Sequence, residues 1–263
     1  MAEMRGTALI TGASGGIGLE LARKLVAEGF DTILVARSAE KLEELSREIG
    51  DRYGRKATVV AADLSKADGP QDVYRRVEEA GLEVDVLVNN AGFASFGAFH
   101  ESDLDRELGM IQVNIAALAH LTHLFLPEMV ARGSGRVLNV ASTAAFQPGP
   151  LMAGYYASKA FVLHFSEALA VELEGTGVTV TALCPGPTES GFQSRANMED
   201  SKLVQGGLMS SSRVAEFGYR ALIKGKRVAI PGIFNKLGTL APRLLPRKLV
   251  ARSVKKLQEP GGR

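Results

Sequence analysis

Cysteine is almost missing from the 263-residue sequence, and long apolar runs are missing altogether. The single cysteine, Cys184, excludes an intramolecular disulfide, which fits a reducing compartment and a cytoplasmic location. Nowhere do about 18 uninterrupted apolar residues occur, so we expect no helix that spans a bilayer. The first residues, MAEMRGTALITGASG, reach a strand pattern within about six positions, which leaves no room for a secretory signal. We therefore expect a soluble protein.

Charge is distributed unevenly along the chain, although the formal net charge is only +2. After residue 223 a single acidic residue, Glu259, accompanies the following basic residues: Lys224, Lys226, Arg227, Lys236, Arg243, Arg247, Lys248, Arg252, Lys255, Lys256 and Arg263. The body of the protein is therefore acidic and its C-terminal tail is basic.

Short aliphatic segments alternate with amphipathic helical segments. Strand patterns occur at 7–11, 31–37, 57–64, 85–92, 135–142 and 178–186, and helix patterns at 18–29, 39–54, 70–81, 111–133 and 155–177. Strands that are almost continuously apolar indicate a parallel sheet that is covered by helices on both faces. No linker, internal repeat or shift in composition divides the chain. We therefore predict a single α/β domain over 1–263, with a doubly wound parallel sheet in three αβα layers.

The first strand pattern ends in a turn that is rich in glycine. In TALITGASGGIGLELA the strand leads into Gly12, Gly15, Gly16 and Gly18, and then directly into a helix. Bare backbone at such a turn lets a phosphate approach the exposed amides of the helix N-terminus. A flexible loop would explain glycines alone, but the order strand, turn, helix is the one that a dinucleotide site requires.

These motifs resemble those of the short-chain dehydrogenase/reductase family, and the resemblance covers nearly the whole chain. The family patterns TGxxxGxG, an adenine-side Asp, NNAG and PG are matched by Thr11, Gly12, Gly16, Gly18, Asp63, Asn89, Asn90, Ala91, Gly92, Pro185 and Gly186. The resemblance implies a Rossmann-like fold. Together with the residues discussed next, it gives the expected cofactor-binding set: Gly12, Ser14, Gly16, Ile17, Gly18, Arg37, Ser38, Asp63, Leu64, Asn90, Ala91, Gly92, Tyr155, Lys159, Pro185, Gly186 and Thr188.

The end of the second strand bears on which dinucleotide is bound. An acidic residue there would bind the ribose 2′-hydroxyl and repel a 2′-phosphate, but ILVARS has Ala36 and Arg37. The guanidinium of Arg37 can form two hydrogen bonds to a phosphate, and the hydroxyls of Ser38 and Ser14 add donors. NADP(H) is therefore favoured over NAD(H). Two considerations weigh against this. Many NADP-preferring relatives have a basic residue in the glycine turn, where this chain has Gly15. Arg37 could also be simply a solvated side chain that follows a strand.

Two tyrosines precede a lysine in GYYASKAF. On a helix Lys159 neighbours both Tyr155, four positions earlier, and Tyr156, three positions earlier, so spacing alone does not choose between them. The family's active site combines a YxxxK pair with a Ser thirteen residues before the Tyr, and counting from Ser142 reaches Tyr155. Tyr156 fails both counts, and we expect it to pack in the core or at a subunit contact.

By the same resemblance the catalytic residues are Asn114, Ser142, Tyr155 and Lys159. A free tyrosine has a pKa near 10, and a nearby lysine ammonium together with an oxidised nicotinamide would lower it. In the reductive direction Tyr155 would protonate the carbonyl oxygen while Ser142 hydrogen-bonds the same oxygen. Lys159 would also bind the nicotinamide ribose, and Asn114 would order a water in a proton relay. An asparagine within a helix can instead be a local backbone partner.

Other candidate groups have simpler explanations. His120 and His123 are spaced like metal ligands, but no convincing carboxylate or cysteine joins them, so we expect no metal. They and His164 are expected to be packed or at the subunit interface that the resemblance implies. Five residues near the motifs would either line an apolar pocket or pack in the core: Phe93, Phe96, Phe146, Met152 and Phe192. The longest stretch without a strand signal, 189–212, is the expected substrate loop.

These features predict an NADP(H)-dependent oxidoreductase that interconverts a carbonyl and a secondary alcohol, with reduction as the expected direction. The apolar residues near the site, and the resemblance of the tail to relatives acting on lipid-like compounds, suggest an apolar ketone, a 3-oxoacyl group or a steroid-like substrate. A non-catalytic NADP(H)-binding sensor or scaffold is one alternative, and the intact Ser142, Tyr155 and Lys159 argue against it. An epimerase or dehydratase with YxxxK is another. We expect a homodimer or homotetramer and no nucleic-acid partner.

The C-terminal extension, 236–263, is predicted to contain an amphipathic helix. In PRKLVARSVKKLQ, Val250, Val254 and Leu257 share one helical face, and basic residues occupy much of the rest. Such a helix could lie weakly on an anionic membrane surface. Its apolar stripe could instead pack on the body of the protein or on a neighbouring subunit, with the charges solvated.

Overall fold

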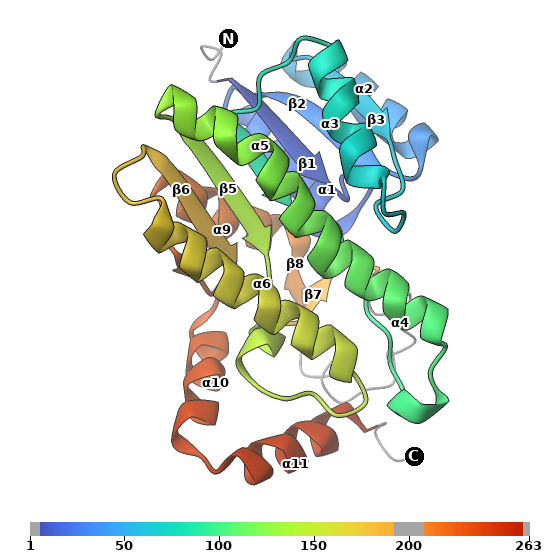
Figure 1. Ribbon diagram of the computed structural model, residues 1–263, viewed down its shortest axis with the longest axis vertical. Coiled ribbons are helices and arrows are strands. Elements are labelled where there is room, and N and C mark those ends of the chain that lie inside the picture. Colours follow the sequence, from blue (N-terminus) through green and yellow to red (C-terminus); the bar gives the residue numbers. More distant parts are fainter. Residues whose placement is uncertain (1–5, 192–207, 260–263) are drawn as a thin grey trace.

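A seven-stranded parallel sheet forms the centre of the protein in this computed structural model, which describes residues 6–191 and 208–259 (Figure 1). The sheet has the order β3-β2-β1-β4-β5-β6-β9. Its strands are β1 (Thr7–Thr11), β2 (Asp31–Ala36), β3 (Ala57–Ala61), β4 (Val86–Asn89), β5 (Gly135–Val140), β6 (Val178–Leu183) and β9 (Val228–Ala229). The order reverses between β1 and β4, as in a doubly wound sheet, and this confirms the predicted fold class.

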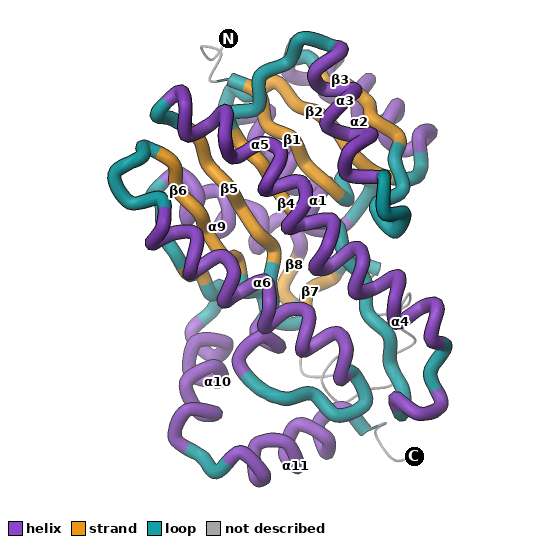
Figure 2. The backbone as a smooth tube through the Cα atoms, in the orientation of Figure 1, coloured by secondary structure: helices purple, strands orange, loops and turns teal. Residues whose placement is uncertain are grey.

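Helices cover both faces of the sheet, and Figure 2 shows the strands sandwiched between them. One face is covered by α1 (Gly16–Ala27), α2 (Ala39–Tyr53) and α9 (Ser211–Ile223), and the other by α3 (Gly69–Glu79), α5 (Leu118–Arg132) and α6 (Ala153–Glu172). The remaining elements are η1 (Phe99–Glu101), α4 (Leu104–Ile111), η2 (Gln112–Ala117), η3 (Thr143–Phe146), β7 (Thr188–Glu189), β8 (Met209–Ser210), α10 (Ile233–Leu244) and α11 (Arg247–Gln258).

Alternate residues of the central strands feed hydrophobic cores on opposite faces of the sheet. In β1, Ile10 joins the core beneath α1, α2 and α9, whereas Leu9 joins the core beneath α3 and α5. The register aligns the carboxyl ends of the central strands: Ile10 pairs with Val88, and Val88 pairs with Leu138. The polar residues that follow these strands therefore meet along one edge of the sheet.

The sequence did not predict β9 at the edge of the sheet. This strand has only two residues and pairs with β6 through Ala182 and Leu183. Such a short segment carries no periodicity from which a strand could be recognised.

A long helix runs across one face of the sheet. The segments α4, η2 and α5 form one continuous helix, Leu104–Arg132, of 29 residues. By length and mean hydropathy this helix could cross a membrane, contrary to the expectation that no helix would. The expectation was based on an uninterrupted apolar run, whereas a mean hydropathy can be high even when some residues of the helix are polar. In the protein Leu121, Phe125 and Met129 of this helix are buried against the sheet. It is therefore a core helix of this fold.

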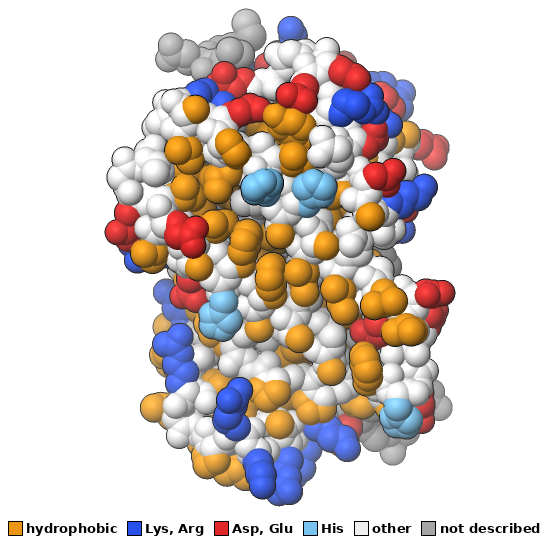
Figure 3. Space-filling view, in the orientation of Figure 1, with side chains coloured by type: hydrophobic (Ala, Val, Ile, Leu, Met, Phe, Trp, Pro, Cys, Tyr) orange, Lys and Arg blue, Asp and Glu red, His pale blue; other side chains and the backbone are white. Residues whose placement is uncertain are grey.

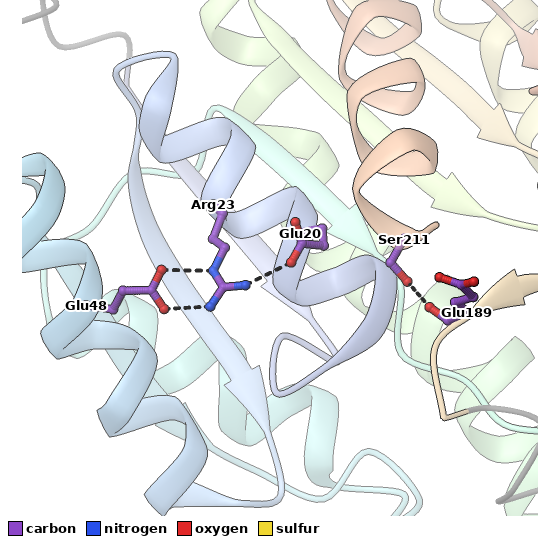
Figure 4. Close-up of polar contacts among 5 residues, drawn as sticks. All are labelled: Glu20, Arg23, Glu48, Glu189 and Ser211. Atoms are coloured by element: carbon purple, nitrogen blue, oxygen red, sulfur yellow. Dashed lines mark hydrogen bonds and ion pairs between the residues drawn. The ribbon is translucent and has the colours of Figure 1, made fainter. Parts of the chain in front are cut away.

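Polar contacts tie the glycine-turn helix and the β7–β8 pair to their neighbours (Figure 4). The guanidinium of Arg23 on α1 donates two hydrogen bonds to Glu48 on α2, at 2.9 and 2.7 Å, and one to Glu20 at 2.8 Å. The hydroxyl of Ser211 donates to the backbone carbonyl of Glu189. This bond joins β7 to the first residue of α9. Phe192 and most of the expected substrate loop lie outside the described residues.

The C-terminal extension forms two helices, α10 and α11, below the sheet in the view of Figure 1. Val250 and Val254 of α11 are buried against the body of the protein, in the same cluster as Met152 and Tyr156. Leu257 is 51% exposed. The structure thus agrees with the packing alternative for the two valines and not for the leucine.

Candidate active site

A cavity of about 530 Å³ opens at the carboxyl ends of the central strands. Every member of the expected cofactor-binding set lines it except Gly18. Of the expected catalytic residues Ser142, Tyr155 and Lys159 also line it, whereas Asn114 lies directly behind. The cavity thus joins the glycine turn at one end to the serine, tyrosine and lysine at the other.

The glycine turn leaves no room for side chains at two of its positions. A Cβ atom at Gly18 would lie 2.4 Å from the carbonyl oxygen of Gly12, and Gly12 has a φ of +67°. The turn is held to β4 by Thr11, whose hydroxyl accepts hydrogen bonds of 2.9 Å from the backbone N–H groups of Asn90 and Ala91. Bare backbone therefore faces the cavity at the N-terminus of α1, where an anion is stabilised.

Gly15 differs from these glycines. Its backbone is extended, and a Cβ atom built there would meet nothing within 4 Å. A Cβ atom therefore fits at this position without moving its neighbours.

Basic and hydroxyl side chains gather at the end of β2. Arg37 is exposed at the cavity and makes no ion pair within residues 6–191 and 208–259. Ser38 precedes α2 without capping it through its side chain. The structure adds Lys41, which sequence reasoning missed; it lies in the first turn of α2 and lines the same cavity as Arg37. Its position four residues after Arg37 was the signal that could have identified it.

Asp63 follows β3, the strand next to β2, and lines the same cavity as these cations. The hydroxyl and the backbone N–H of Ser65 donate to its carboxylate at 2.7 and 3.0 Å. These bonds, with smaller contributions from Arg37 and Lys66, lower the pKa of Asp63. The carboxylate is therefore held charged and oriented at the expected adenine side.

Ser142 and Tyr155 present their hydroxyl groups to the same part of the cavity. Ser142 follows β5, and its hydroxyl accepts a hydrogen bond of 3.1 Å from the backbone N–H of Ala144. Burial raises the pKa of Tyr155, and a hydrogen bond with Ser142 lowers it by less. In the protein alone desolvation thus outweighs the hydrogen bond, and the lowering expected from Lys159 together with an oxidised nicotinamide stays a prediction.

Lys159 is buried beneath Tyr155. Its ammonium nitrogen donates to the backbone carbonyl of Val140 at 2.8 Å and lies 5.9 Å from the centre of the Tyr155 ring. Burial lowers the pKa of Lys159 to about 8. The lysine is thus oriented by the end of β5 and sits one helical turn from the tyrosine that it is expected to assist.

Asn114 occupies a π-helical segment, η2, in the middle of the long helix. Its side-chain amide donates to the Phe93 carbonyl oxygen at 3.1 Å and to the Ser158 hydroxyl at 3.0 Å, and its oxygen accepts from the Phe93 N–H at 3.2 Å. These partners lie on other segments, so Asn114 is not a local partner of its own helix. Single π-turns occur frequently at functional sites, because the wider turn redirects a side chain.

Tyr156 packs as expected, with one addition. Its ring is buried beside Tyr155, with centroids 6.1 Å apart and planes at 79°. Its hydroxyl accepts a hydrogen bond of 2.6 Å from the side-chain amide of Gln258 on α11. Burial raises the pKa of Tyr156. This hydroxyl is thus engaged by the C-terminal helix, although Tyr156 also lines the cavity.

The cavity wall next to Tyr155 is largely apolar. Phe93 and Met152 line it, whereas Phe96 and Phe146 pack against neighbouring clusters and do not. Gln147 is a polar residue of this wall that sequence reasoning missed.

Three of the four histidines, His120, His123 and His164, are the candidates from the sequence. His120 is half-buried on α5, and His123 and His164 are exposed. Within the part of the chain that the structure describes, no three His, Cys, Asp or Glu side chains are grouped as a metal site would need.

Comparison with known proteins gives independent information. A family model for short chain dehydrogenases matches residues 6–201. The very-long-chain 3-oxoacyl-CoA reductase of Anas platyrhynchos is 39% identical over 184 residues, which cover 68% of this chain and 58% of that protein. The chain thus spans less than two thirds of the length of this relative.

Solved structures agree over nearly the full chain. A short-chain dehydrogenase from Sphingobium yanoikuyae in complex with NADPH has a TM-score of 0.81 and 30% identity, covering 91% of this chain and 94% of that one. A 7β-hydroxysteroid dehydrogenase has a TM-score of 0.85 and 28% identity, covering 95% and 96%. The chain belongs to the short-chain dehydrogenase/reductase family of oxidoreductases.

Proposed function

We propose that the protein is an NADP(H)-dependent reductase that converts an apolar ketone or 3-oxoacyl group to a secondary alcohol. One observation carries the proposal. The hydroxyls of Ser142 and Tyr155 meet at one end of a cavity whose other end holds Arg37 and Lys41.

The residues present fit a dinucleotide phosphate. At Gly12 and Gly18 a Cβ atom would collide with Asn90 or with neighbouring backbone, so these glycines allow the tight turn whose bare backbone lines the cavity. Arg37 and Lys41, with the hydroxyl of Ser38, supply the charge and donors that a 2′-phosphate requires. No carboxylate takes the place of Ala36 or Arg37 to repel it. NADPH in the related Sphingobium structure also supports this cofactor.

The residues of the chain would carry out the proton chemistry. NADPH, when bound, supplies the hydride. Tyr155 is protonated at neutral pH, because burial raises its pKa, and a neutral phenol is the form that donates a proton to a carbonyl oxygen. Ser142 holds the same oxygen by a hydrogen bond as negative charge develops on it.

Lys159 and Asn114 position this pair and return the proton. The Lys159 ammonium, anchored to Val140, is placed to favour the phenolate that forms once Tyr155 has given up its proton. Asn114 is fixed by Phe93 and Ser158, next to Gly92 and Lys159, so it can hold a water in line with the lysine. This water would restore the proton from solvent.

The substrate class follows from the cavity wall. Phe93, Met152 and Tyr156 give an apolar surface next to the reacting hydroxyls, and Gln147 is a polar exception. Such a wall suits a ketone with bulky hydrocarbon substituents, a 3-oxoacyl chain or a steroid-like molecule. The names of the 3-oxoacyl-CoA reductase and hydroxysteroid dehydrogenase relatives agree with this class. We further propose a cytoplasmic homodimer or homotetramer.

A panel assay tests the function directly. The purified protein is mixed with NADPH or NADH and a set of bulky ketones, 3-oxosteroids, 3-oxoacyl thioesters and small hydrophilic ketones, and cofactor oxidation is followed by absorbance. We expect turnover with NADPH and with at least one apolar ketone or thioester, and little with the small ketones. Tight NADPH binding with no turnover of any compound would instead favour a non-catalytic sensor.

A further inference from the structure

Helix α10 has its apolar side facing solvent. Ile233, Leu237, Leu240 and Leu244 recur at the spacing of one helical face, and they are 62%, 57%, 50% and 85% exposed. Phe234 beside them is 86% exposed. We call these five residues the apolar stripe. In an ordinary surface helix such a stripe faces the core, so the orientation of α10 is inverted.

The polar side of α10 is the side that packs on the protein. Thr239 is only 4% exposed, and its hydroxyl donates to the Lys236 carbonyl at 2.8 Å. Asn235 donates to the Pro231 carbonyl at 2.6 Å and lies against Gly186 of the cavity wall. The two hydrogen bonds are local to the helix and its entry, whereas the contact of Asn235 with Gly186 joins this polar face to the body of the protein. The outward orientation of the stripe is therefore built into the way that the helix is held.

Basic side chains surround the stripe. The one acidic residue in or next to α10 and α11 is Glu259. The cations of the two helices are all exposed: Lys236, Arg243, Arg247, Lys248, Arg252, Lys255 and Lys256. Leu245 and Leu249, about half exposed, extend the apolar surface from α10 to α11. Figure 3 shows Lys and Arg side chains gathered with hydrophobic ones over these helices, at the lower end of the molecule.

We propose that α10 and α11 dock the protein on an anionic lipid membrane, with the apolar stripe inserted at the headgroup boundary. The stripe supplies the apolar contact, and the flanking cations match lipid phosphates. A second copy of the chain is a poorer occupant, because pairing this surface with itself would bring the cations of both copies together. The surface differs from the one expected from sequence, since Val250 and Val254 of α11 are buried in the protein.

The docking surface adjoins the apolar end of the cavity. Asn235 of α10 touches Gly186, and α11 packs on Met152 and Tyr156, all three of which line the cavity. A membrane on this surface would therefore lie on the same side of the molecule as the proposed substrate site. This consequence rests on the proposed function, whereas the docking itself does not.

Vesicle flotation tests the docking. Neutral phosphatidylcholine vesicles are compared with vesicles of phosphatidylcholine and phosphatidylglycerol, at about 20 mM and about 500 mM NaCl, because salt screens exposed charges. We expect the full chain to float with the anionic vesicles at low salt, and much less at high salt or with neutral lipid.

Two sets of variants locate the surface. Leu237→Gln, Leu240→Gln and Leu244→Gln together should reduce flotation at least fivefold, as should Lys248→Glu with Arg252→Glu. The matched control is Leu104→Gln with Leu108→Gln, two leucines of α4 that are 64% and 53% exposed, and it should float like the unchanged chain. All variants should reduce a dissolved compound that is turned over in the panel assay at the original rate, so that a failed catalytic assay and a failed docking assay remain distinct.

A fluorescence reading gives a second measurement of insertion. The chain contains no tryptophan, so Phe234→Trp creates a single reporter on the stripe. Its emission should shift to shorter wavelength on adding anionic vesicles at low salt. The absence of both flotation and an emission shift would overturn the proposal. It would also be overturned if the triple leucine variant formed a smaller oligomer while the unchanged chain did not bind vesicles. That last result would assign the stripe to contact between copies of the chain.

Discussion

The side-chain amide of Gln258 donates a hydrogen bond of 2.6 Å to the hydroxyl of Tyr156, although 102 residues separate them in the chain. Both side chains are buried. The bond fixes α11 to the residue next to Tyr155. The C-terminal helix is thereby part of the support of the candidate active site.

Breaking this bond from one side should cost stability. In Tyr156→Phe the amide of Gln258 is left buried without its acceptor, and we expect unfolding to become easier by about 1–3 kcal/mol. Adding Gln258→Leu to Tyr156→Phe removes the unpaired amide, so the double variant should recover most of the lost stability. The leucine also removes the amide oxygen of Gln258, which has no partner among the described residues. Urea denaturation of the single and double variants measures this. Losses that simply add would show that the bond contributes nothing.

Activity should separate the two tyrosines. Tyr155→Phe removes the proton donor and should lower kcat at least about a hundredfold, while NADPH binding stays largely intact. Tyr156→Phe should retain most activity, because the hydroxyl it loses faces Gln258. Steady-state kinetics with a reducible ketone decide the matter. A severe loss in Tyr156→Phe with near-normal Tyr155→Phe would reverse the assignment.

Cofactor preference should depend on the cations at the end of β2. Arg37→Asp should raise the KM for NADPH at least tenfold, equivalent to about 1.4 kcal/mol, and affect NADH less. Lys41→Glu should act in the same direction. Arg47→Asp, the same charge change on an exposed residue of α2 outside the cavity, is the control. An unchanged protein that already prefers NADH would contradict the role of Arg37.

The stability of the cofactor-free protein should depend on pH through Lys159. The pKa of Lys159 is about 8 in the folded protein, compared with an ordinary value of 10.5. Below pH 8 the lysine is charged in both states, so the full cost of burying its charge lowers the stability of the folded protein. Between pH 8 and 10 the unfolded chain binds more protons at this lysine, and stability should rise with pH by roughly 2 kcal/mol. Lys159→Met should lack this rise. Urea denaturation of both proteins at matched pH values measures the difference, and parallel curves would rule out the lowered pKa.

Much of the fold could be predicted, because its parallel strands are short, apolar and punctuated by glycine or polar residues. The pattern of TALITGASGGIGLELA encodes both a strand and the turn that follows it, and both were found where expected. β9 escaped notice since two residues carry no periodicity. Strand order also places Ser142, at the end of β5, near the cavity, but only the fold shows which hydroxyl it faces.

The orientation of the C-terminal helices could not be predicted from spacing. The periodicity of α11 identified Val250 and Val254 as one face, and burial of that face is the usual outcome. The same rule fails for α10, where Thr239 is buried and Asn235 contacts Gly186, so that the polar side turns inward. The raised pKa of Tyr155 likewise depends on burial, which no local pattern encodes.

The hydrogen bonds that hold the glycine turn have a consequence for how the protein is made. Thr11 accepts from the N–H groups of Asn90 and Ala91, which follow it by 79 and 80 residues. A growing chain therefore contains the whole turn long before it contains the strand that fixes it, and contacts of such long range form slowly. Nascent chains that end before Asn90 should therefore be unable to hold this turn, and dinucleotide retention should arise only after the later cofactor-binding residues, through Thr188, have also left the ribosome.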